Sequence, residues 1–383
     1  MSSNNLLNTR NLIVILGAIA LFSLIFLAKL IVVTGIPFYF FLIILGGILL
    51  VFLESKKIFV INIQEFFIII FMFWLLIPIS NAYNVMSSIL QYYYFAISFL
   101  LFFLIKRFCF NEKDWVFISK ALLLGGCITS ILMILNFDSI FEGDRVNING
   151  INANYLAYSL VTLLPVLYIF LNNRRKNKIY YCFLLLFSAA IFLTGSRGAL
   201  ISLIIFYVFL SFKKPLFGLA IFLIIISCFT IFLGFYDSLP QYWKTRFDFQ
   251  SFASNDVDWS SGREATWTTA WRIFEDHYIF GIGPNNFGEI GGFGINVHNV
   301  FLSLLVETGI FGFILYFMAF FSILFFITKK NILLGVIVLL IEIPIFFTGV
   351  WESSPVLWVV LSLLMAYVTL FDVKNSKYQS IKW

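Results

Sequence analysis

Twelve long apolar runs, each bounded by charged or turn-forming residues, constrain this chain more than any other feature. A helix needs roughly 20 apolar residues to cross a bilayer, so runs of this length predict transmembrane helices, some of them short or tilted. The expected fold is an all-α polytopic membrane protein with about 12 transmembrane helices, in which residues 1–383 form a single integral membrane domain. The runs are 11–30, 35–53, 63–80, 86–105, 115–137, 151–171, 178–194, 198–212, 215–235, 299–328, 331–349 and 354–371.

The composition excludes the common soluble classes. The chain is 61% hydrophobic and 11% charged, whereas a soluble domain has about 45–50% apolar and about 25% charged residues. A soluble globular enzyme, a disordered tail and a nucleic-acid-binding module are therefore excluded. The four cysteines show no CxxC spacing, so we expect packing residues and neither a zinc site nor a disulfide framework. No cleavage pattern follows Met1–Arg10, so we expect an uncleaved first span.

The distribution of basic residues predicts the orientation. With the N-terminus inside, 17 of the 25 Lys and Arg residues fall in inner segments, seven in outer segments, and Lys120 within a span. Basic loops stay on the cytoplasmic side. Both termini are therefore predicted to be cytoplasmic, and the longest segment between spans, 236–298, to face outward as an extracytoplasmic loop.

This outer segment is predicted to contain an amphipathic helix over 262–277. Ser261 and Glu264 have the spacing of a capping box, and aromatic residues then recur at helical spacing to give one apolar face. That face is expected to comprise Trp267, Trp271, Phe274 and Tyr278.

Two arginines open predicted helices on the outer side. Arg263 lies in the first turn of the 262–277 helix, where a cation opposes the helix dipole unless an anion such as a phosphate binds there. Arg197 lies between two glycines at a predicted outer boundary, where a charge is costly unless it is paired or faces a watered cavity. A solvated surface arginine and a snorkelling interfacial arginine remain the alternatives.

Two outward turns carry further polar residues. The segment 142–154, with Arg145 and four asparagines, is suited to sugar hydroxyls or phosphate, although Asn and Gly are also ordinary turn residues. The segment 281–288, with Gly281, Gly283 and Asn286, lacks the strand and helix that flank a nucleotide fingerprint, so we expect a structural turn.

The remaining candidates are a histidine and a pair of acids. His298 opens the tenth span, and histidine is the side chain best able to exchange a proton near neutral pH. It is a candidate base, with a structural histidine as the alternative. Asp256 and Asp258 match a DxD metal-nucleotide motif, but nucleotide sugars are cytoplasmic and the loop is acidic, so no metal site is predicted and the role of this pair stays open.

The order of these motifs resembles the O-antigen ligase and O-antigen polymerase family of bacterial surface-polysaccharide glycosyltransferases, over residues 145–312. The sequence departs from the family at Tyr278, where a proline often follows the histidine. The matching motifs are Arg145 to Asn154, Ser196-Arg197-Gly198, Gly262-Arg263 with Trp267, 281–287, His298 to Leu302, and Glu307 to Gly312.

The resemblance implies a C-type glycosyltransferase in the bacterial inner membrane, with its active site facing the periplasm or cell exterior. Such enzymes transfer a glycan from undecaprenyl diphosphate to a sugar hydroxyl without a cofactor or a required metal. By this likeness Arg197 and Arg263 hold the diphosphate, His298 is the catalytic base, and Arg145 is a weaker candidate for donor or acceptor binding.

The residues do not identify the acceptor. A polymerase of repeat units is favoured because the outer loop shows no evident basic patch for an anionic core. A ligase that moves the chain onto lipid-A core and a protein O-glycosyltransferase use the same donor site. A polysaccharide or lipid flippase is the rival from another class, for which Glu65, Lys120, Glu307 and Glu342 provide charges within spans. A flippase and a chain-length regulator are expected partners; nucleic acid is not.

Overall fold

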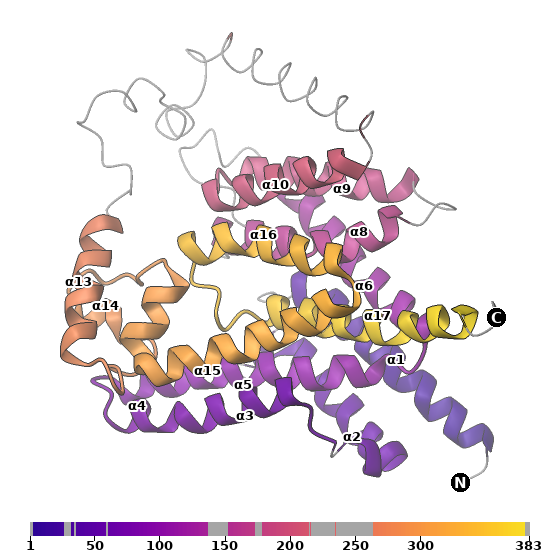
Figure 1. Cartoon of the computed structure of the whole chain (residues 1–383), viewed down its shortest axis with the longest axis horizontal. Coiled ribbons are helices and arrows are strands. Elements are labelled where there is room, and N and C mark those ends of the chain that lie inside the picture. Colours follow the sequence, from indigo (N-terminus) through magenta and orange to yellow (C-terminus); the bar gives the residue numbers. More distant parts are fainter. Residues whose placement is uncertain are drawn as a thin grey trace.

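A computed structural model describes residues 3–26, 32–33, 36–58, 60–136, 152–172, 178–213, 215, 234 and 263–379 of the chain. Within these residues the molecule is a bundle of helices (Figure 1). Its only strands in the described part are β1 (Val32–Val33) and β2 (Ile36–Pro37), which pair antiparallel between the first two helices.

The helices follow the predicted runs closely. In eleven of the twelve predicted runs most of the described residues are helical, although the run 35–53 begins in β2; the run 215–235 lies almost wholly outside the described residues. Five helical segments are long and apolar enough to cross a membrane, and five shorter apolar helices accompany them in the described ranges. The helices before the outer segment are α1 (Ser3–Phe26), α2 (Phe38–Ile58), α3 (Ile63–Trp74), α4 (Leu76–Ser80), α5 (Val85–Phe108), α6 (Glu112–Leu135), α7 (Ala153–Thr162), α8 (Leu164–Asn172), α9 (Lys178–Leu193) and α10 (Arg197–Lys213). Those after it are α13 (Arg263–Asp276), α14 (Phe287–Ile290), α15 (Val300–Lys330), α16 (Ile332–Thr348) and α17 (Pro355–Gln379).

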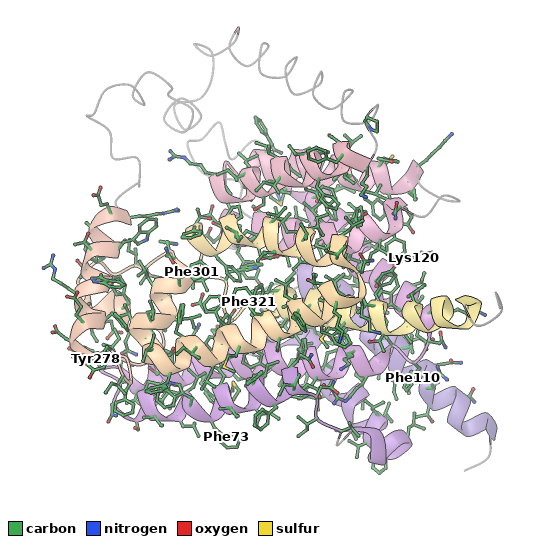
Figure 2. All side chains as sticks on the ribbon, in the orientation of Figure 1. Phe73, Phe110, Lys120, Tyr278, Phe301 and Phe321 are labelled. Atoms are coloured by element: carbon green, nitrogen blue, oxygen red, sulfur yellow. The ribbon has the colours of Figure 1, made fainter. Side chains whose placement is uncertain are left out.

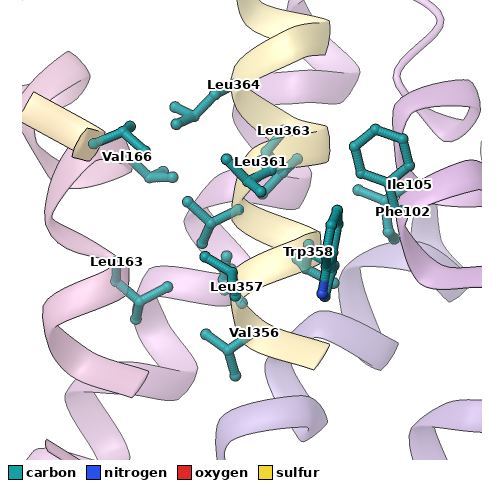
Figure 3. Packing of buried hydrophobic residues seen from close by; sticks show 14 of the residues in the cluster. Phe102, Ile105, Leu163, Val166, Val356, Leu357, Trp358, Leu361, Leu363 and Leu364 are labelled. Atoms are coloured by element: carbon teal, nitrogen blue, oxygen red, sulfur yellow. The ribbon is translucent and has the colours of Figure 1, made fainter. Parts of the chain in front are cut away.

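Helix α17 lies at the centre of the bundle. Every residue from Val356 to Ala366 is buried, as expected for a helix that is apolar on all sides. Trp358 packs edge-on against Phe99, with ring centroids 4.6 Å apart, and Figure 3 shows it beside Phe102 and Ile105 of α5. Ser362 Oγ donates to the Phe102 carbonyl oxygen at 2.7 Å, so a hydroxyl in this apolar core still has the partner that it requires.

The two ends of the bundle differ in chemistry. Helices α13 and α14 lie at one end, beyond the start of α15, whereas the start of α1 and the end of α17 lie at the other (Figure 1). At the end with the termini, Arg107 donates from Nη1 and Nη2 to the two carboxylate oxygens of the buried Glu65, at 2.6 and 3.1 Å. Glu65 also accepts from the backbone N–H of Asn62 and caps α3. This acid is therefore part of a structural cap and ion pair.

Candidate functional site

His298 lies at the junction between the outer segment and α15. Asn299 is the N-cap of α15, and its Oδ1 accepts from the backbone N–H groups of Phe301 and Leu302 at 3.0 and 3.2 Å. His298 directly precedes this cap with φ of 52°, in the left-handed region that non-glycine residues seldom adopt. Such strained residues gather at functional sites, and the imidazole is half-buried here.

Helix α13 packs directly against this junction. The Trp267 indole N–H donates to the Val297 carbonyl oxygen at 3.0 Å, so a side chain one turn after Arg263 bonds to the residue just before His298. Ala270, Val297 and Val306 belong to one small apolar cluster beneath the helix. These contacts hold the start of α13, and hence Arg263, at the same end of the bundle as His298.

The predicted apolar face of this helix is partly wrong. The helix spans 263–276, close to the predicted range, but its buried residues are Thr266 and Ala270. Trp271 is 50% exposed and Tyr278 55% exposed, and the Trp271 indole bonds to Glu275 on the outer side of the helix. Small side chains allow α13 to approach the bundle closely, which turns the larger rings away.

Arg197 is the first residue of α10, and its neighbour fixes this helix start against α16. A Cβ on Gly198 would collide with the Thr348 side chain and lie 3.2 Å from the Pro344 carbonyl oxygen, so only glycine permits this close approach. One turn later, Ser202 Oγ donates to the Ile341 carbonyl oxygen at 2.6 Å. The start of α10 is thus anchored at the end of α16.

A continuous set of contacts connects this anchor to His298. The ring of Phe301, three residues after His298, lies with its centroid 5.0 Å from that of Phe347 and 6.0 Å from that of Phe346. Thr348 follows in the chain and contacts the start of α10. Arg197, Arg263 and His298, from three separate segments, therefore lie at the same end of the bundle.

The turn at 281–288 joins this end to α5. Asn286 is fully buried; its Oδ1 accepts from the Asn84 backbone N–H at 2.6 Å, and its Nδ2 donates to Ser88 Oγ at 2.6 Å. Gly281 and Gly283 have φ of 73° and 94°, and a Cβ on Gly281 would meet the backbone of Glu307. These contacts indicate that Gly281, Gly283 and Asn286 stabilise the turn.

Sequence reasoning missed a buried polar group at this end. Glu352, in the short connection between α16 and α17, accepts from Ser303 Oγ at 3.2 Å and from the Trp351 backbone N–H at 2.9 Å. Burial raises the pKa of the Glu352 carboxyl above its ordinary value. Ser303 lies one turn after the N-cap Asn299, so this carboxyl supports the first turn of α15. An acid between two apolar runs on the predicted outer side was the available signal.

Arg145, Asp256, Asp258 and Ser261 fall outside the described residues. Within the described ranges, no group of three or more His, Cys, Asp or Glu residues is placed to hold a metal ion.

Comparison with known proteins finds a family likeness over part of the chain. Residues 182–317 match the family model described as O-antigen ligase. No curated protein matches the chain. The family match supports glycosyl transfer of the O-antigen ligase or polymerase type in surface-polysaccharide synthesis, by an enzyme in a bacterial membrane. Over residues 182–317, which include Arg197, Arg263 and His298, the match confirms the resemblance to the O-antigen ligase and polymerase family.

Proposed function

We propose that this protein transfers a glycan from undecaprenyl diphosphate to a sugar hydroxyl and thereby joins the repeat units of a surface polysaccharide. The observation that carries the proposal is the placement of Arg197, Arg263 and His298, from three separate segments, at one end of the bundle. All three belong to the segment that matches the family model. The predicted topology puts this end outside the cytoplasm, where lipid-linked repeat units are joined.

Each residue has one role in the proposed reaction. The His298 imidazole takes the proton from the acceptor hydroxyl, which requires a heavy-atom distance of about 2.6–3.2 Å in the substrate complex. The acceptor oxygen forms a bond to the anomeric carbon as the bond from that carbon to the diphosphate oxygen breaks. The diphosphate leaves with the electron pair, and the planar forks of Arg197 and Arg263 stabilise its growing charge. A single displacement of this kind inverts the anomeric centre.

A ligase is the second candidate, because the matching family model is described as O-antigen ligase. It shares the donor and the three residues and differs in its acceptor, the lipid-A core. A flippase is disfavoured by the surroundings of two of the four charges within predicted spans. The Glu65 carboxylate is paired with Arg107, and Lys120 is exposed on α6.

Deleting the gene tests the proposed function and separates these candidates. Surface and lipid-linked glycans of the deletion strain are resolved on a gel. We expect single repeat units to replace the polymer, because the joining step is lost. Finished polymer that remains on its lipid carrier would assign the ligase reaction, and an unchanged ladder in both fractions would contradict glycan transfer by this protein.

Replacing the arginines with lysine tests their proposed contact with the diphosphate. Lysine keeps the charge but lacks the planar fork that binds two phosphate oxygens at once. We expect Arg197→Lys and Arg263→Lys each to lower kcat/KM for the lipid-linked donor by about tenfold or more, the loss of about 1.4 kcal/mol of transition-state stabilisation. The matched control is Arg272→Lys, at an exposed position later in α13. Donor kinetics unchanged in both variants would remove the arginines from diphosphate binding.

A further inference from the structure

A cavity of about 810 Å³ opens on the side of α13 near its C-terminal end. It lies between the corner that joins α4 to α5, the end of α13, and the turn that leads into α14. Its volume is within the range of small-molecule sites. None of Arg197, Arg263 and His298 lines it, so it is separate from the proposed reaction centre although it lies at the same end of the bundle.

Three aromatic rings line this cavity and remain accessible. Tyr83 is 76% exposed, Tyr278 55% and Phe280 45%, and Figure 2 shows Tyr278 at the edge of the bundle. Neither tyrosine hydroxyl makes a hydrogen bond within the part of the chain that the structure describes. A sugar ring has an apolar face of C–H groups, and flat aromatic surfaces with a polar edge suit such a ligand.

Polar side chains stand beside these rings. Asn81, Asp276 and His277 line the cavity, and their side chains have no hydrogen-bond partner among the described residues. Glu289 is held in place by the Asn84 side-chain amide, at 2.8 Å. Carboxylates accept strong hydrogen bonds from hydroxyl groups, and an amide both donates and accepts. Convergent groups of this kind fix the orientation of a polar ligand.

The wall of the cavity over residues 277–281 is held in place by hydrogen bonds and ring packing. The Tyr278 carbonyl oxygen accepts from the Ile310 backbone N–H at 2.8 Å, and the Gly281 N–H donates to the His277 carbonyl oxygen at 2.9 Å. The Phe280 ring stacks on Trp74 with centroids 5.9 Å apart. A preformed site of this kind loses little conformational entropy when a ligand binds.

We infer that this cavity binds a short stretch of neutral oligosaccharide from the polysaccharide on which the enzyme acts. Tyr83 and Tyr278 provide stacking surfaces, while Asp276, Glu289 and Asn81 accept from the sugar hydroxyls. The two carboxylates disfavour acidic sugars. The inference rests on the proposed function for the identity of the ligand, and it adds a subsite that holds sugars away from the bond being formed.

Exposed tyrosines at the end of a membrane-spanning bundle also serve as anchors in the lipid headgroup region. The polar groups distinguish the two roles. An anchor needs rings that face lipid, whereas these rings share a cavity with two acids and an amide that have hydrogen-bonding capacity for hydroxyl groups.

Direct binding tests the inference. The probe is the polysaccharide of the host cell, freed from lipid by mild acid, cut into short oligosaccharides, and titrated calorimetrically into the full-length protein in lipid nanodiscs. We expect the wild-type protein to bind the probe, and Tyr278→Ala and Asp276→Asn each to weaken binding tenfold or more. Tyr278→Phe keeps the ring and is expected to keep most of the affinity, and an unchanged Tm in Tyr278→Ala would show that its loss of binding is not a folding defect.

Two controls separate this inference from the proposed reaction. Trp271→Ala removes a comparably exposed ring, on α13 and outside the cavity, and it should leave binding unchanged. His298→Ala should abolish transfer but keep binding, so failure of the reaction and failure of the subsite give different results. Wild-type protein that transfers glycan without binding the probe, or Tyr278→Ala that binds as tightly as wild type, would overturn the inference.

Discussion

Replacing His298 with alanine is expected to abolish glycan transfer while the protein is still made and inserted. General base catalysis contributes typically 10²–10⁴-fold, and the acceptor hydroxyl has no other base assigned at this site. We therefore expect the rate of transfer to fall by at least about 10²-fold. The measurement is polymer formation by purified protein in nanodiscs from lipid-linked repeat units, with membrane insertion checked by fractionation.

The backbone at this position supplies the matched variant. His298 has φ of 52°, which alanine adopts at a cost and asparagine adopts more readily. His298→Asn therefore keeps the local conformation but removes the group that accepts the proton. Both variants should be inactive if the imidazole is the base. Wild-type activity in His298→Asn, with loss in His298→Ala, would assign the residue to shaping the backbone and would exclude it from proton transfer.

The sequence predicted the helices well because hydrophobic length is a local property. The run 299–328 corresponds to α15, Val300–Lys330, and the run 178–194 to α9, Lys178–Leu193. A helix in a bilayer must satisfy its own backbone hydrogen bonds, so an apolar run of this length has few other structures open to it. The start of a helix is also a local property, since Asn299 caps α15 with its own side chain.

Contacts between distant segments were not predictable in the same way. Trp271 has the helical spacing of a buried residue, yet it is turned outward because Thr266 and Ala270 form the contact with the bundle. Glu352 is explained only when Ser303, 49 residues earlier in the chain, is seen beside it. Which side chains contact one another depends on packing between helices. The hydropathy of one helix does not indicate which other helix packs against it.

The break in α15 is the clearest case of information that hydropathy does not contain. Gly309 has φ of 69° and ψ of 179° inside an otherwise continuous apolar helix. The Val306 carbonyl oxygen accepts from the Ile282 N–H at 2.9 Å, and the Ile310 N–H donates to the Tyr278 carbonyl oxygen at 2.8 Å. In an unbroken helix the Val306 carbonyl and the Ile310 N–H would bond to each other. Here both bond instead to the segment that follows α13, so neither is left without a partner. Nothing in the apolar run 299–328 predicts this exchange.

Gly309→Ala is expected to destabilise the protein strongly. The backbone conformation at this position is essentially restricted to glycine, and a Cβ here would collide with the Ile279 carbonyl group and lie 2.8 Å from the Phe280 nitrogen. Backbone atoms cannot move aside as a side chain does, so the segment 278–283 must separate from α15. We expect a loss of about 3 kcal/mol or more, measured as a lower Tm in detergent at a fixed scan rate.

Gly292→Ala is the matched control for this substitution. Gly292 also has a positive φ, of 74°, but no atom lies within 4 Å of a Cβ built there. Its alanine variant therefore carries only the conformational cost of about 1–2 kcal/mol, and the difference between the two variants measures the collision with the 279–280 backbone. Because that backbone follows directly from α13, whose Trp267 bonds to the residue before His298, Gly309→Ala should also lower the transfer rate, whereas Gly292→Ala should not. Equal Tm values for the two variants would mean that the segment 279–280 and α15 are not in close contact at Gly309.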